Sequence, residues 1–83
     1  MYFTEDEVSD IYKRIGLKVK ALRESRKMTQ LDLSLEMGYK SVSLVSAAEL
    51  SADNKHFNIE HLYKISKILD VEMSYFFEDI ASN

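Results

Sequence analysis

The sequence contains no cysteine and no proline, and only two of its 83 residues, Gly16 and Gly38, are glycine. The lack of cysteine excludes disulfides and thiolate metal sites, and it suits a protein of the reducing cytoplasm. The scarcity of residues that favour tight turns argues against a β-rich fold. Together with the many Leu, Lys, Glu, Ile and Ser residues, it favours an all-helical protein.

Long apolar runs are also missing. No stretch approaches the ~18–20 residues of a membrane span, and no signal-peptide pattern opens the sequence, so we expect an intracellular, cytoplasmic protein. Hydrophobic residues make up 46% of the chain and charged residues 30%, the balance of a soluble globular protein. Residues 1–83 are therefore expected to form one domain, near the size where a single core is only just sufficient.

The chain also has no net positive charge, since its formal net charge is -3. Phosphate binding draws on Lys and Arg, so this balance taken alone argues against a nucleic-acid partner. The charges are unevenly distributed, however. Residues 1–12 and 70–83 carry four acids each and no base, whereas residues 13–69 carry eleven bases and six acids, a surplus of +5. The middle of the chain is therefore the part suited to an anionic partner.

Apolar residues at spacings of three and four predict a long first helix at about residues 5–26. Thr4 followed by Glu7 indicates a capping box at its start, and acids precede bases along it, as the helix dipole prefers. The stripe expected to face the core consists of Val8, Ile11, Ile15, Val19 and Leu22.

Two short helices with a tight turn between them are predicted next. Thr29, with Asp32 three residues on, caps a helix at about 30–37, which Gly38 ends in a left-handed conformation, and a second helix follows at about 43–50. Such a pair forms a rigid angle that can seat its second helix in the major groove of DNA. The positions expected to face the core are Leu33, Met37, Val45 and Ala48.

The last third of the chain predicts two more helices after a polar loop at 51–56. Asn58 caps a helix at about 59–69, and a fifth helix is expected at about 72–79. The sequence thus predicts a compact, all-α fold of five helices. The apolar positions at helical spacing are Ile59, Leu62, Ile65, Ile68 and Leu69 in the fourth helix and Met73, Phe76, Phe77 and Ile80 in the fifth.

Four stretches of the chain resemble a known family. They are Ile15-Gly16 to Leu22-Arg23, Met28-Thr29-Gln30 with Leu33 and Gly38, Val45-Ser46 to Glu49, and Asn58-Ile59 to Asp70-Val71. In this order and spacing the chain resembles the Cro/phage-repressor type of helix-turn-helix regulators, also called xenobiotic-response-element-like domains. The likeness spans roughly residues 11–77. It implies a repressor-like DNA-binding domain in which the second and third helices form the helix-turn-helix.

The resemblance also implies roles for individual residues. In this family an arginine late in the first helix pairs with a glutamate late in the third, and Arg23 and Glu49 stand at those positions. The alternative is that the two charges stay exposed and never meet. Gln30 resembles the family's phosphate-contacting glutamine, with a role in capping alone as the other interpretation. The full set expected to contact DNA is Thr29, Gln30, Lys40, Ser41, Val42, Ser43, Ser46, Ala47 and Lys55, with Arg26 and Lys27 as further candidates for phosphate contacts.

Two departures from the family pattern affect the recognition helix. One extra residue lies between Gly38 and Glu49, so the register of this helix is open by one residue. Recognition helices of the family usually present Gln, Arg, Asn or Lys to base edges, whereas this one offers short side chains, which discriminate less than a bidentate pair. Specificity is then expected to be modest, or to rest on DNA shape and thymine methyl contacts.

Some apolar residues lack an obvious partner. Leu31 and Leu35 are i,i+4 neighbours at positions that the family leaves polar, so we expect the N-terminal segment or a partner subunit to cover them. Of Tyr75, Phe76 and Phe77, two are expected in the core and the third in a dimer contact.

Neither a catalytic site nor a metal site is predicted. His56 and His61 lack a spaced set of further ligands, and no nucleophile signature, glycine-rich phosphate loop or paired carboxylates accompany them. No cofactor or small-molecule ligand is implied. We therefore expect a non-enzymatic, sequence-specific transcriptional regulator that binds double-stranded DNA as a homodimer, with the third helix in the major groove. The alternative is a protein-interaction module on the same fold, antitoxin-like or adaptor, with weak or no DNA binding.

Overall fold

Four α-helices, two short 3-10 helices and no strand are found in residues 2–79, the part of the chain that the computed structural model describes. The elements are α1 (Glu5–Ser25), α2 (Gln30–Glu36), α3 (Ser43–Leu50), η1 (Ala52–Asn54), α4 (Ile59–Leu69) and η2 (Met73–Phe77). The prediction of an all-α fold is confirmed, and the four α-helices lie within one residue of the predicted ranges. None of the helices in this described part is both long and apolar enough to span a bilayer.

The prediction of a fifth α-helix at 72–79 is wrong, because this segment contains the 3-10 helix η2 instead. In a 3-10 helix, side chains three residues apart lie on the same side. Met73 and Phe76 therefore both face the body, where Phe76 is fully buried and Met73 packs against the core. Ile80, the last apolar position of the predicted helix, lies outside the described residues.

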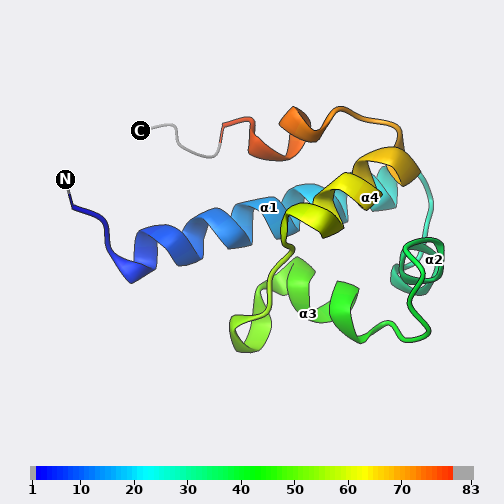
Figure 1. The fold of residues 1–83 in the computed structure, drawn as a ribbon, viewed down its shortest axis with the longest axis horizontal. Helices are drawn as coiled ribbons and strands as arrows, with labels where there is room; N and C mark the ends of the chain where they lie inside the picture. Colours follow the sequence, from blue (N-terminus) through cyan, green and yellow to red (C-terminus); the bar gives the residue numbers. More distant parts are fainter. Residues whose placement is uncertain (1, 80–83) are drawn as a thin grey trace.

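Helix α1 runs along the long axis of the molecule, with the other elements gathered around its C-terminal half (Figure 1). Helix α3 lies along one edge of the molecule and η2 along the opposite edge, with α1 between them. Contacts join α1 to α3, α4 and η2, and α2 packs against both α3 and α4. The N-terminal half of α1 extends beyond this body, which makes the molecule 40 Å long but only 26 and 20 Å in its other dimensions.

The core forms where all four α-helices meet η2. Its buried apolar residues are Ile15, Val19, Leu22, Leu33, Met37, Val45, Ala48, Phe57, Leu62, Ile65, Leu69 and Phe76. Val8 and Ile11 were expected to face the core, and Ile59 was one of the apolar positions of the fourth helix, but all three are exposed. Of the aromatic residues 75–77, two were expected in the core, and Phe77 is the one that stays exposed. Val8 and Ile11 belong to the overhanging part of α1, where residues 2–11 are all exposed, and Ile59 is the first residue of α4. These three side chains line one hollow at the edge of the core, where neighbouring elements cover them only in part.

Capping boxes start three of the four α-helices. Thr4 and Glu7 form the box of α1, and Thr29 and Asp32 form that of α2. In α4 the Asn58 side chain accepts the backbone N–H of His61, while Nδ1 of His61 accepts the backbone N–H of Asn58 at 3.0 Å. These local bonds satisfy amide groups that a helix start leaves unpaired, which explains why the sequence located these helix starts so closely.

The role of His61 makes the start of α4 sensitive to pH. Its Nδ1 accepts a hydrogen bond only while unprotonated, and burial lowers the pKa of His61 below its ordinary value of 6.5. The unfolded chain therefore binds this proton more readily, so stability is lost as the pH falls below about 6.5. His61→Gln keeps an acceptor that does not titrate there. In urea titrations between about pH 7 and pH 5.5, we expect the unfolding free energy to fall more steeply for the parent than for His61→Gln. Equal slopes would contradict this role.

Helices α1 and α3 lie close together at Gly16. A Cβ atom at this position would lie 2.5 Å from the backbone oxygen of Glu49 and 2.6 Å from that of Ala48. Both of these oxygens belong to the rigid backbone of α3, so they cannot move aside as the end of a flexible side chain could. Gly16 is therefore required for the distance between the two helices, not for an unusual backbone angle.

Replacing Gly16 by alanine is expected to destabilise the protein, although alanine is the better helix former by about 0.5–1 kcal/mol. The added methyl group would force α1 and α3 apart, and such overpacking costs about 1–3 kcal/mol. We expect Gly16→Ala to lower the unfolding free energy, measured by urea denaturation, by about 1–2 kcal/mol. The matched control is Ser9→Ala at an exposed position of α1, which should leave stability unchanged or slightly raised. A stabilised Gly16→Ala variant would refute the close approach.

Candidate nucleic-acid interface

Helix α3 has one face committed to the core and one face left outward. Val45, Ala48 and Glu49 are completely buried. The opposite face, at i, i+3, i+4 and i+7 spacing, consists of Ser43, Ser46, Ala47 and Leu50, and it ranges from partly to largely exposed. Leu50, 60% exposed, was missed in the sequence analysis, although its i+7 spacing from Ser43 marks it as part of this face. The inward position of Glu49 also decides the register that the extra residue had left open.

The turn before α3 is well ordered by hydrogen bonds. Gly38 adopts a left-handed φ of 96°, as predicted, and the next backbone N–H, of Tyr39, bonds back to the carbonyl oxygen of Ser34 at 3.0 Å. The Ser41 hydroxyl accepts the backbone N–H of Ser43 at 3.1 Å and lies 2.7 Å from the Ser43 hydroxyl. The residues expected to contact DNA here, Lys40, Ser41 and Val42, are all exposed.

A buried ion pair ties α3 to α1. Arg23 Nε donates to Glu49 Oε2 at 2.7 Å and Arg23 Nη2 donates to Glu49 Oε1 at 3.0 Å, so the contact is bidentate. Arg23 Nη1 also donates to the carbonyl oxygen of Met28 at 2.7 Å, in the segment between α1 and α2. The hydrogen bond to Glu49 raises the pKa of Arg23. Arg23 and Glu49 are thus brought together as the resemblance implied.

Gln30 belongs to the same network, a contact that the sequence analysis missed. Its Nε2 donates to Glu49 Oε1 at 3.0 Å, which links the first residue of α2 to the end of α3. Its neighbour Thr29, the N-cap of α2, is exposed and accepts the backbone N–H of Asp32. The Gln30 side chain is therefore neither a plain cap nor a wholly exposed phosphate ligand, since one amide hydrogen is committed to Glu49 and one is left.

The remaining basic residues that were predicted to contact DNA are Arg26, Lys27, Lys40 and Lys55. Arg26, a candidate for phosphate contact, is exposed, and its Nε donates to the carbonyl oxygen of Leu69 at 3.2 Å, at the end of α4. Lys27 is exposed and ends α1 with a left-handed φ of 59°. Lys40 precedes α3 in the sequence and Lys55 follows it, after η1, and both are exposed. Helix α3 itself contains no basic residue.

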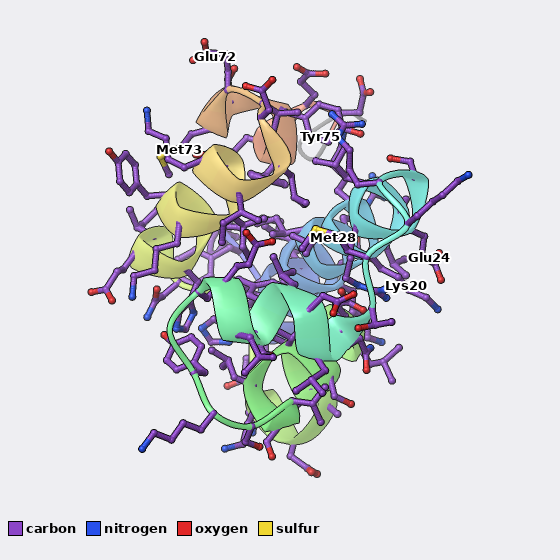
Figure 2. The ribbon with its side chains drawn as sticks, turned by 90° about the vertical axis from the view of Figure 1, so that its right-hand side faces the viewer. Lys20, Glu24, Met28, Glu72, Met73 and Tyr75 are labelled. Atoms are coloured by element: carbon purple, nitrogen blue, oxygen red, sulfur yellow. The ribbon has the colours of Figure 1, made fainter. Side chains whose placement is uncertain are left out.

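The acidic segment of residues 70–79 lies away from α3. It runs along the opposite edge of the molecule (Figure 1), and Figure 2 shows Glu72 at that edge, pointing outward and away from α2 and α3. Helix α3 contains a single acid, Glu49, which is buried and paired with Arg23. The outward face of α3 is therefore uncovered and without carboxylates of its own, which are two conditions for approach to a polyanion.

Leu31 and Leu35 of α2 are not covered by the N-terminal segment, contrary to one of the two expectations. Both are about half exposed, and the N-terminus lies at the far end of α1 from α2 (Figure 1). Phe3 instead lines a shallow hollow together with Tyr12 and His56. The part of the chain from residue 2 to 79 holds no group of three or more His, Cys, Asp or Glu side chains placed to bind a metal ion.

Comparison with known families agrees with this geometry. The helix-turn-helix family model of the Cro/C1 type matches residues 19–76, which is more than half of the chain. The chain belongs to this helix-turn-helix family. The matched region starts within α1 and ends within η2, so it contains the ion pair and both helices of the motif. Members of the family are DNA-binding domains. A search of the curated proteins found none that matches the chain.

The ion pair offers a direct test of how α3 is held in place. Removing either partner alone strands a buried charge, so Arg23→Met and Glu49→Met are each expected to lower the unfolding free energy by about 3–5 kcal/mol. The double variant is expected to lose much less than the sum of the two, because no charge is left unpaired. Thermal or urea unfolding followed by circular dichroism measures all three.

The exposed pair between Lys64 and Glu60 of α4, 3.2 Å apart, is the matched control. Glu60→Gln should change the unfolding free energy by less than about 0.5 kcal/mol, because exposed pairs of this kind contribute little. Additive losses in the Arg23/Glu49 cycle would show that the two residues do not act as a pair.

Proposed function

We propose that this protein is a non-enzymatic, sequence-specific DNA-binding transcriptional regulator, with α3 in the major groove and α2 crossing the backbone. The observation that carries the proposal is the outward face of α3. It is uncovered, free of carboxylates and held at a defined angle by the Arg23–Glu49 pair on its inner side. Family membership supports the same assignment.

The contacts to bases would come from the turn and the outward face of α3. Ser43 and Ser46 offer hydroxyl groups that can donate or accept, and Val42 and Ala47 offer methyl groups suited to thymine. Leu50 extends this face with a further apolar side chain. With no long polar side chain on α3, direct readout would be weak, so we propose that DNA shape contributes a large share of specificity.

Contacts to phosphates would fix the protein on the duplex. Lys40 and Lys55 lie in the chain on either side of α3 and are both exposed. Thr29, Gln30 and Ser41 carry polar groups at the start of α2 and in the turn, and Gln30 keeps one amide hydrogen beside its bond to Glu49. Contacts of this kind give affinity that depends on salt but carry little sequence information.

The proposed regulator acts as a homodimer, since two-fold pairing would place two copies of α3 about one DNA turn apart. No cofactor is part of the proposal. Because its partner is duplex DNA, we expect the protein to work in the compartment that holds DNA.

A protein-interaction module is the second candidate function. Two observations favour it: α2 exposes Leu31 and Leu35 side by side, and α3 contains no base. Exposed apolar pairs of this kind are typical of surfaces that bind another protein. In this case α2, and not α3, would bind the partner protein.

Selection of bound fragments from random duplex DNA tests the first proposal against the second. We expect a symmetrical consensus and binding that weakens steeply with salt. Lys40→Ala should weaken binding to all duplexes alike and lower the salt slope by about one unit. Ser43→Glu should abolish binding, because it places a carboxylate on the outward face of α3. At a helix start that carboxylate favours the helix, so the fold should be kept.

Lys67→Ala is the matched control, since Lys67 is an exposed lysine of α4 and no part of the proposed interface. It should leave both affinity and salt slope unchanged. If the parent protein enriches no duplex at low salt, or if Ser43→Glu binds as well as the parent, the proposal is refuted and the protein-interaction function is favoured.

A further inference from the structure

A second surface of the molecule is built for contact but has no role in the proposed DNA interface. Val8 and Ile11 of α1, Ile59 of α4 and Phe77 of η2 are exposed apolar side chains around one hollow of about 400 Å³. Buried Phe57 and Leu62 form part of its lining. We call this hollow and its four exposed side chains the apolar groove.

The apolar groove continues the hydrophobic core past the point where the chain covers it. Val8 and Ile11 lie on the same helical face as Ile15, which is 4% exposed, and the difference is only that α1 extends beyond the body there. Contiguous apolar side chains of this kind on a small domain mark an interaction site. The groove lies along the N-terminal half of α1, separate from the outward face of α3.

Charges along α1 indicate which partner fits. Beside the face of α1 that carries Val8 and Ile11, the acids Glu5 and Glu7 come first and the bases Arg14 and Lys18 follow. The change of sign on this face falls between residues 7 and 14, around Ile11. A second α1 laid antiparallel across this point would place acids against bases at both ends, whereas a parallel copy would place like charges together.

The charged side chains near this boundary are exposed, and Arg14 also donates from Nη1 to the carbonyl oxygen of Asp79 at 3.3 Å. Arg14 and Asp10 form an exposed i,i+4 pair at 2.8 Å, with side chains about half exposed. Pairs of this kind contribute little and can exchange partners. The overhang of α1 is therefore self-complementary: apolar at its centre and opposite in charge at its two ends.

We propose that the apolar groove is a self-association surface, in which α1 of one copy packs antiparallel against α1 of a second copy with the two-fold axis near Ile11. Val8 and Ile11 of each copy then lie against Ile59 and Phe77 of the other. An isologous contact of this type needs the same patch on both copies, which a single self-complementary helix provides. The sequence analysis expected one unspecified residue of Tyr75, Phe76 and Phe77 in a dimer contact, and Phe77 is the exposed one of the three.

This inference rests on the proposed function in one respect, since it supplies the two-fold pair that a symmetrical DNA site requires. Pairing itself is measured without DNA. Sedimentation equilibrium of the full chain is expected to show a monomer–dimer equilibrium that weakens as salt is raised. Ile11→Gln and Ile59→Gln should each raise the dimer dissociation constant about tenfold or more, because each removes a central apolar contact.

Leu17→Gln is the matched control. Leu17 is also an exposed apolar residue of α1, 55% exposed, but it does not line the apolar groove. It should leave the dissociation constant unchanged. Circular dichroism of all variants checks that the fold is kept.

The absence of cysteine allows the orientation to be tested as well. Ile11→Cys should form a disulfide between two copies under mild oxidation, because residues near a two-fold axis meet their own counterparts, whereas Leu17→Cys should not. A chain that stays monomeric at millimolar concentration, or a dimer that Ile11→Gln leaves intact, would overturn the inference. A stable dimer that binds no duplex would refute only the proposed DNA function, and a monomer that binds DNA would refute only the self-association.

Discussion

The buried pair between Arg23 and Glu49 is the interaction on which the arrangement of the helix-turn-helix depends. Its bidentate geometry joins α1 to α3, its third arginine donor reaches Met28 in the segment before α2, and Gln30 adds a bond from α2 to the same carboxylate. Two charges placed inside a small core are costly to bury and contribute little net stability as a pair. What they provide is geometry, because any other position of α3 would leave a charge unpaired in the interior.

The same end of α3 is fixed a second time through its backbone. The carbonyl oxygens of Ala48 and Glu49 lie so close to Gly16 that no side chain fits between the two helices. The inner side of α3 is thus fully used by packing and by the ion pair, and only the opposite side remains for a partner. That side consists of small residues and Leu50, so a rigid scaffold presents a surface without long polar or charged side chains. Such a surface favours contacts based on shape over base-specific hydrogen bonds.

The molecule separates its charged and apolar surfaces along the chain. The acids of residues 70–79 lie on the edge opposite α3 (Figure 1), so four of the eight acids outside residues 13–69 are kept away from the outward face of α3. The overhang of α1 places the apolar groove away from α3 as well, so one domain has room for a DNA partner and for a second copy at the same time. Whether a protein binds DNA is thus a matter of where its charges lie and not of their sum.

The sequence by itself determined the helix starts, because Thr4, Thr29 and Asn58 act through bonds within one turn of their own helices. It also determined the stop at Gly38, and through family resemblance the Arg23–Glu49 pair. Only the tertiary structure decided that Val8, Ile11 and Ile59 stay outside the core, that Gln30 bonds to Glu49, and that residues 73–77 form a 3-10 helix. The physical reason is the distance along the sequence over which each interaction acts. Capping and turn preferences depend on neighbours in sequence, whereas burial depends on which distant element reaches a given helical face.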